Sequence, residues 1–142
     1  MAELSTSGLE DIIGSLEELV KLPDEVVLEM LTAEAEVVAE AQEAEAKAMG
    51  VYDTGETAMS VSYGNKLINK GGKRCLYVYP RGTHKSGNKR RTAEVAFVNE
   101  YGVKSRKMPA KPFIRTANEK SADAAHDAAA RVYDEYLKSK NL

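Results

Sequence analysis

Apolar residues recur at helical spacing through the first third of the chain. A first group predicts a short helix within residues 1–22, with Ser7 and Glu10 as a possible capping box. Its apolar members are Leu9, Ile12, Ile13, Leu16, Leu19 and Val20. A second group follows Pro23 and predicts a long helix over residues 23–50. Its apolar face consists of Val26, Val27, Met30, Leu31, Val37, Val38 and Ala41.

The polar face of the second predicted helix is acidic. Acids spaced three or four residues apart on a helix repel one another. Seven alanines between residues 33 and 48 offset this repulsion through their helix propensity, and they let a neighbour approach closely. The face is therefore either a solvated surface or a surface for a basic partner. Its members are Glu29, Glu36, Glu40 and Glu43.

After this helix the pattern changes to alternation. The segments "AMSVSYG" (58–64) and "RCLYVYP" (74–80) predict two strands, and the "NKGG" between them predicts a turn, so we expect an antiparallel hairpin. The segment "AEVAFVNEYG" (93–102) predicts a further strand or a strand-to-turn element. The predicted sheet thus spans residues 58–102 and is interrupted by a long, basic, glycine-containing loop at 81–92.

The last part of the chain predicts a loop and a helix. Residues 103–112 are basic and contain two prolines, which indicates extended loop, and a helical stripe follows over 113–138. Thr116 and Glu119 form a second possible capping box. A length of 142 residues fits one domain. We therefore expect a single α+β domain, with an antiparallel sheet of three to four strands packed against the long N-terminal helix and the C-terminal helix.

The net charge of −2 conceals a strong segregation of charge along the chain. Residues 1–60 carry 15 acids and 2 bases, whereas residues 61–115 carry 2 acids and 14 bases. Such asymmetry indicates either that the two halves neutralise each other within one monomer or that they pair with another molecule or copy.

The lack of a recognisable targeting or membrane-spanning segment leads us to expect synthesis in a cytoplasm. The segment "MAELSTSGLED" is acidic and lacks the order of a signal peptide, and no apolar run is long enough to span a membrane. A single cysteine, Cys75, cannot form an internal disulfide and fits a reducing compartment. We expect no membrane partner.

The triplet Asp53-Thr54-Gly55 is also found at the catalytic carboxylate of aspartic proteases. Such enzymes hold two aspartates together on rigid loops of an all-β body so that they share a proton. Here the triplet follows a long predicted helix, and the strands that a protease requires are missing from the pattern. A turn explains the residues better, because Asp and Thr side chains bond nearby backbone amides and glycine adopts turn conformations.

The remaining candidates for chemistry are isolated residues. His84 lies in the basic loop and His126 in the last predicted helix, and neither has the spacing of a metal site. Cys75 lies in a predicted strand, where a small core residue is the simpler interpretation. We therefore expect no enzymatic activity, no metal and no cofactor.

Nucleic-acid binding is the chemical alternative. The basic segment 61–115 contains tyrosines on which bases could stack. The acidic first half would oppose phosphates unless it is turned away, and two of the tyrosines share one face by strand periodicity and could instead belong to the core. The tyrosines are Tyr63, Tyr77, Tyr79 and Tyr101.

Three stretches together resemble one protein family. They are "YDTGETAMSV" (52–61), "AEVAFVNEYG" (93–102) and "KMPAKPFIRTA" (107–117), the last leading into the C-terminal helix. In spacing and sequence they resemble the HK97 gp10-like family of tailed-bacteriophage neck and tail-completion (head–tail joining) proteins. The resemblance covers roughly residues 9–138.

The residues that match this family fall in its three motifs. Departures are Ala58, where the family more often has a larger residue, and the unusually basic loop 81–92. The matching residues are Asp53, Thr54, Gly55 and Ser60 in the first motif, Glu100, Tyr101 and Gly102 in the second, and Met108, Pro109, Ala110, Lys111, Pro112, Phe113, Ile114, Arg115 and Ala117 in the third.

The resemblance implies a structural virion protein without catalytic activity. Members of such families form rings, commonly hexameric, at the head–tail junction, where they contact portal or connector proteins on one side and tail-tube or tail-terminator proteins on the other. The genome passes through the ring. A tail terminator or a minor capsid-associated protein is the neighbouring alternative.

A ring needs two different, complementary patches on each copy. We expect the acidic helix face to meet bases of the next copy, and we expect loop 81–92 to become ordered only against a partner. Phe113 is expected to be a core residue. The proposed interface consists of Glu29, Glu36, Glu40 and Glu43 on one copy and Arg81, Lys85, Lys89, Arg90 and Arg91 on the other.

Overall fold

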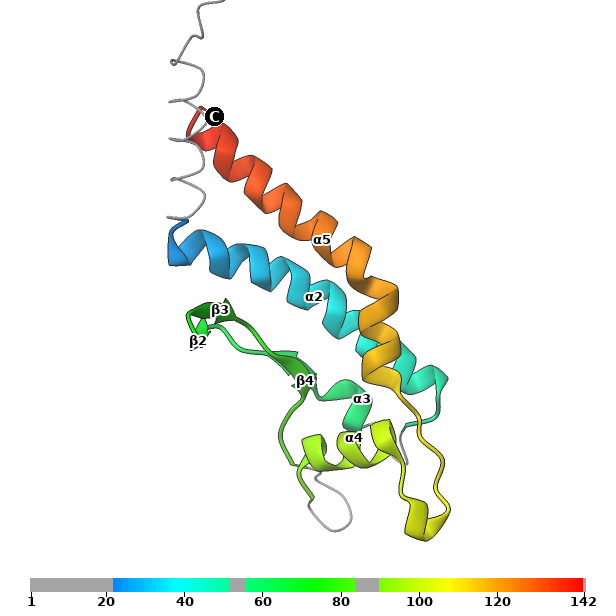
Figure 1. Cartoon of the computed structure of the whole chain (residues 1–142). Coiled ribbons are helices and arrows are strands. Elements are labelled where there is room, and N and C mark those ends of the chain that lie inside the picture. Colours follow the sequence, from blue (N-terminus) through cyan, green and yellow to red (C-terminus); the bar gives the residue numbers. More distant parts are fainter. Residues whose placement is uncertain (1–21, 52–55, 84–89, 142) are drawn as a thin grey trace, which may run out of the picture.

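Two long antiparallel helices, α2 (Asp24–Ala48) and α5 (Phe113–Ser139), form the frame of the molecule (Figure 1). The computed structural model describes residues 22–51, 56–83 and 90–141. The predicted N-terminal helix within 1–22 and the Asp53-Thr54-Gly55 turn therefore lie outside the described residues, apart from Leu22 itself. The long helix predicted over 23–50 and the C-terminal helix predicted over 113–138 are both confirmed.

The helices α2 and α5 pack through small side chains. The buried positions of α5 follow one another at intervals of four residues, which places them along one face of the helix. Small residues let the two backbones approach closely, so the pair is held together by close packing and not by large interlocking side chains. Apart from the bulky Phe113 at the core end, these positions are the small Ala117, Ser121, Ala125 and Ala129 on α5, and the buried residues of α2 are Ala35, Gln42 and Ala46.

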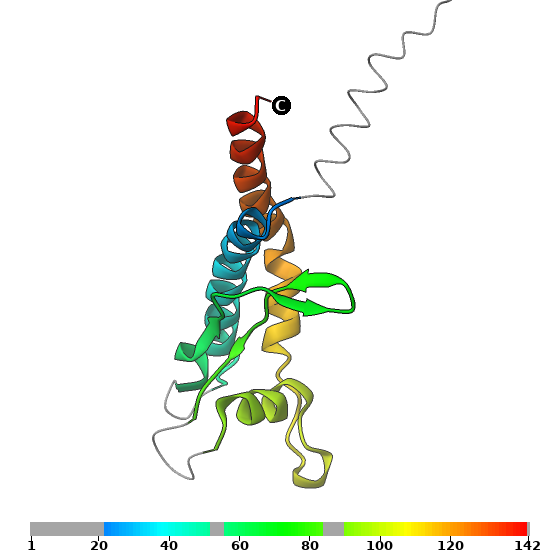
Figure 2. The ribbon, with the colours of Figure 1, turned by 90° about the vertical axis from the view of Figure 1, so that its left-hand side faces the viewer.

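The hydrophobic core lies at one end of this helix pair. It forms where the end of α2 meets α3 (Glu56–Met59), α4 (Thr92–Tyr101) and the first turn of α5. Both views show α4 lying across this end (Figures 1 and 2). The bulkiest member is Phe113, which is fully buried as expected, and the others are Ala46, Val51, Ala58 and Ala96.

The strands form two separate antiparallel pairs. β1 (Val61–Tyr63) pairs with β4 (Val78–Pro80), so the predicted antiparallel pairing is confirmed for these residues, but the strand predicted over 74–80 is divided because its first two residues pair elsewhere. Between them, β2 (Ile68–Lys70) pairs with β3 (Lys73–Cys75) around the predicted glycine turn. The expectation of one sheet of three to four strands is not confirmed, because each sheet has two strands. The mixed helix-and-sheet class holds.

Two segments predicted as strand are helical. Residues 56–59 form α3, so the strand expected from Ala58 begins only at Val61. The segment 93–102, predicted as a strand or strand-to-turn element, lies in the helix α4 and its C-terminal glycine. A short apolar run does not distinguish a strand from a buried helix by its period. Here the helix is favoured because it buries Thr92 and Ala96, four residues apart on one face, and places Ala96 in the core.

The linker between α4 and α5 is a compact turn rather than a purely extended loop. A short 3-10 helix, η1 (Lys104–Arg106), is closed by backbone hydrogen bonds between Val103 and Met108. The predicted capping box of Thr116 and Glu119 is wrong, because α5 begins at Phe113 and Thr116 already lies inside it.

Candidate interaction surface

The Glu100-Tyr101-Gly102 motif lies at the joint between α4 and α5. The Glu100 carboxylate accepts hydrogen bonds from the backbone N–H groups of Ile114 at 2.9 Å and Arg115 at 3.0 Å. The first turn of a helix leaves such donors without internal partners and carries a partial positive charge. Glu100 therefore caps α5 from a neighbouring helix, which replaces the local capping box that the sequence predicted.

Gly102 is required by the close approach of the linker. Its φ of +73° favours glycine, and a Cβ atom there would lie 2.7 Å from the Met108 carbonyl oxygen and 2.8 Å from the Ala110 nitrogen. Both obstacles are backbone atoms. The glycine thus lets the chain double back from α4 toward α5, and the Lys111 N–H donates to the Asn99 carbonyl at 2.6 Å to close the joint.

The third motif supplies the other side of this joint. Met108 bonds Val103 across the turn, Pro109 is exposed, and Pro112 occupies the position before α5. Phe113 is buried at the core, and Arg115 is exposed beside it on the first turn of the helix. Of the first motif, Ser60 is described, and its hydroxyl donates to the Thr57 carbonyl at 2.9 Å.

Tyr101 has no comparable role in the fold. Its side chain is 70% exposed, and Phe97, one turn earlier on α4, is 65% exposed. Their rings contact each other in a tilted arrangement, with 4.8 Å between centroids and 49° between the ring planes. Large aromatic side chains left this open on a small domain are typical of interaction sites. A groove of about 760 Å³ borders them, between α4, β4 and the first turns of α5.

The groove is mostly apolar, and the charged residues of its lining are Glu100, Arg115 and Glu119. Its lining includes Tyr79, Ala96, Phe97, Tyr101 and Ile114. Within residues 90–115 there are seven bases and two acids, and one of those acids, Glu100, is occupied in capping α5. Exposed bases near the ends of α4 and on the first turn of α5 are Arg90, Arg91, Lys104, Arg106, Lys107 and Arg115.

The tyrosines of β4 and its approach are open to solvent rather than part of the core. Tyr77 is 39% exposed and Tyr79 is 40% exposed. The Arg81 guanidinium lies over the Tyr79 ring, 4.9 Å from its centroid, and also donates to the Tyr77 carbonyl at 3.4 Å. Arg81 is therefore engaged within its own chain, while Arg90 and Arg91 are exposed and Lys85 and Lys89 lie outside the described residues.

The acidic face predicted on α2 is divided by the structure. Glu29, Glu36 and Glu40 are exposed, whereas Glu43 bonds Lys47 on its own helix at 2.6 Å. Two further acids of α2 instead face α5: Glu45 pairs with Lys120 at 2.6 Å, and Glu34 lies 3.7 Å from His126. Sequence reasoning missed these two pairs because the register between α2 and α5 is set by their alanine seam.

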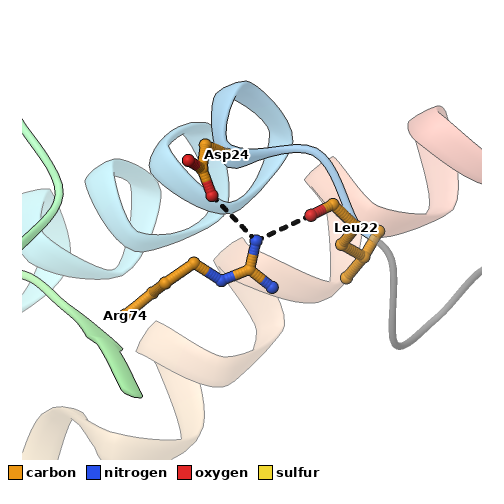
Figure 3. Close-up of polar contacts among 3 residues, drawn as sticks. All are labelled: Leu22, Asp24 and Arg74. Carbon is orange, nitrogen blue, oxygen red and sulfur yellow. Dashed lines mark hydrogen bonds and ion pairs between the residues drawn. The ribbon is translucent and has the colours of Figure 1, made fainter. Parts of the chain in front are cut away.

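One ion pair joins α2 to the basic segment within the described part of the chain. Arg74 of β3 donates from Nη1 to the Leu22 carbonyl at 2.6 Å and to Asp24 at 3.1 Å (Figure 3). The bond holds the β2–β3 hairpin against the start of α2. It also fixes the point at which the chain before Leu22 joins the frame, at the opposite end of α2 from the groove.

Gln42 is a buried polar contact that the sequence did not reveal. Its Nε2 donates to the Val78 carbonyl at 3.3 Å and to Asn118 Oδ1 at 3.0 Å, so it ties α2 to both β4 and α5. The only signal in the sequence is one glutamine on the alanine-rich side of the predicted helix. This contact positions β4, and with it the wall of the groove.

The residues described by the structure do not assemble a metal-binding cluster of His, Cys, Asp or Glu side chains. His126 is exposed beside Glu34, Cys75 is half-buried in β3, and His84 lies outside the described residues. Within the same described ranges, no helix combines the length and the apolar composition needed to cross a membrane.

Comparisons with protein-family models, with curated proteins and with solved structures find no match to the chain.

Proposed function

We propose that this chain is a structural virion protein of a tailed bacteriophage, which forms a ring at the head–tail junction as a neck or tail-completion protein. The three motif stretches support the role through their resemblance to the HK97 gp10-like family. The observation that carries the proposal is the exposed Phe97–Tyr101 pair on the α4–α5 joint, because it is an apolar surface that the fold itself does not use.

Charge supplies the second half of the proposal. A ring closes through a heterologous interface, in which one patch meets a different patch on the next copy. The exposed acids Glu29, Glu36 and Glu40 on α2 and the exposed bases Arg90 and Arg91 beside α4 are such a pair. Opposite charges of this kind set register and association rate more than affinity.

The partners follow from the role. The ring would contact portal or connector proteins toward the head and tail-tube or tail-terminator proteins toward the tail, with the genome passing through its channel. The protein would need no cofactor and would perform no reaction. Tail terminator and minor capsid-associated protein are neighbouring roles that use the same kind of ring surface.

The mass of the full chain in solution tests this proposal. We expect concentration-dependent assembly to a closed ring of about six copies, because a heterologous interface with the correct rotation closes on itself. Multi-angle light scattering across a concentration series measures it. Raising salt to about 1 M, where the Debye length is roughly 3 Å, should weaken the assembly. A chain that stays monomeric at millimolar concentration contradicts the ring, and salt-insensitive assembly contradicts the charge pairing.

A nucleic-acid-binding module is the second candidate, and the Tyr79–Arg81 pair, in which the tyrosine is exposed and the arginine half-buried, favours it. A tyrosine ring covered by a guanidinium beside a basic loop can stack on bases. This alternative predicts that purified protein carries RNA or DNA that high salt removes, because phosphate contacts weaken steeply with salt. A defined ring free of nucleic acid, with an ultraviolet spectrum of protein alone, counts against it.

A further inference from the structure

The Phe97–Tyr101 groove lacks an occupant within the described part of the chain. Two aromatic rings at its edge are about two-thirds exposed, and Ile114 and Tyr79 line its walls. Exposed bases lie near both ends of α4 and on the first turn of α5, while the acids of the lining are Glu119 and Glu100, the latter engaged in capping α5. The occupant that this surface favours therefore has an apolar face flanked by acids and carries no base to be repelled.

The chain itself contains such a segment. Between residues 9 and 20 six apolar residues recur at helical spacing, and the segment holds four acids and no base. An amphipathic helix laid into an apolar groove is a common way for one chain to bind another. The apolar residues are Leu9, Ile12, Ile13, Leu16, Leu19 and Val20, and the acids are Glu10, Asp11, Glu17 and Glu18.

Geometry decides which copy of this segment can reach the groove. Arg74 holds the Leu22 carbonyl at the start of α2 (Figure 3). The groove lies at the other end, beside the joint where Lys111 Nζ donates to the Gly50 carbonyl. The 25 residues of α2 separate the two points by about 37 Å. A helix over residues 9–20 would span only about 18 Å, too little to return to the groove of its own chain.

We infer that the Phe97–Tyr101 groove of one copy binds residues 9–20 of the neighbouring copy, as an acidic amphipathic helix seated on the α4–α5 joint. This inference rests on the proposed ring and specifies its main contact. Donor segment and acceptor groove lie at opposite ends of each subunit, so the contact is head-to-tail and each copy gives one helix and receives one.

Two variants of the full chain test the inference. The groove variant carries Phe97→Ser and Tyr101→Ser, and the segment variant carries Leu16→Ser and Leu19→Ser. Each variant should self-associate about thirtyfold or more weakly than the wild type, because central aromatic and aliphatic anchors carry most of an interface's affinity. Met59→Ser is the matched control, because Met59 is equally exposed, at 67%, but is not among the residues lining the groove. Thermal unfolding followed by circular dichroism checks that each variant is folded.

Mixing the two variants gives the decisive result. One intact interface can still form between the groove of the segment variant and the segment of the groove variant. The mixture should therefore give a dimer in sedimentation velocity, and no larger ring, at a concentration where each variant alone is monomeric. A mixture that stays monomeric overturns the inference, as does a segment variant that assembles like the wild type.

The wild-type measurement separates the two proposals. If the wild type and the segment variant form the same ring, the proposed function stands and the inference is overturned. A groove variant that assembles normally means that another protein occupies the groove, which also overturns it. A wild type that is monomeric at millimolar concentration overturns the ring and the inference together.

Discussion

Three consecutive residues at the end of α4 have three different roles. Glu100 caps α5 through two backbone N–H groups, and Gly102 allows the linker to pass within contact of α4. Tyr101, between them, is largely exposed. The motif therefore contains two residues that hold the fold, Glu100 and Gly102, and one surface residue, Tyr101, a distinction that the sequence alone does not make.

Gly102 provides a stability test at the scale of a residue. We expect Gly102→Ala to lower the free energy of unfolding by about 2–3 kcal/mol, since an alanine there combines a positive φ with overlap against backbone atoms. Gly50→Ala is the matched control: its φ is +69°, but nothing lies within 4 Å of the added Cβ, so it should cost about 1 kcal/mol. Urea unfolding measures both. Equal losses at the two positions would show that the overlap is relieved without cost.

The helix pair depends on small side chains along its seam. Ala125 of α5 is buried, whereas its neighbour Ala124 is exposed. We expect Ala125→Leu to lower the free energy of unfolding by about 1–3 kcal/mol, because added methylenes in a close-packed seam force the backbones apart. Ala124→Leu, with room in solvent, should change it by less than about 0.5 kcal/mol. A neutral effect of Ala125→Leu in urea unfolding would contradict close packing of α2 on α5.

The elements were predictable to different degrees. The long helices have many residues with one period and a proline just before the start, and α2 also has acids in its first turn, so their bounds followed from the sequence. Helix α4 did not, because ten residues with apolar side chains at both spacings are ambiguous until the core selects Thr92 and Ala96. The four short strands found in the described residues pair in twos because most of the burial there comes from helices, which leaves little apolar surface to hold a wider sheet.

The candidate site was only partly predictable. The acids of α2 and the motif residues were visible in the sequence, but their division into partnered and exposed residues was not. Glu45 and Glu34 face α5, while Glu36 and Glu40 face solvent, and this depends on the rotation of one helix against the other. The exposed aromatic surface of α4 was missed because the segment was interpreted as a strand, on which Phe97 and Tyr101 would have shared a sheet face.

At the scale of the whole molecule, charge reversal tests the pairing of copies. We expect Glu36→Lys with Glu40→Lys to weaken assembly by about tenfold at low salt, because bases would then face the bases of the next copy. Arg90→Glu with Arg91→Glu, introduced into the same chain, should restore much of the loss. Light scattering at two salt concentrations measures both. Failure of the second pair to rescue the first would mean that these residues do not meet.

The helix α2 has a consequence for the size of the assembly. In the proposed ring it separates the point where a subunit gives its segment from the point where it receives one, and its length is fixed by 25 residues held at both ends. In that ring, the length of α2 would therefore set the spacing and tilt between neighbouring subunits. Subunit number would then be set by the number of helical turns in α2, and variants lengthened or shortened by two turns would close into circles of a different circumference.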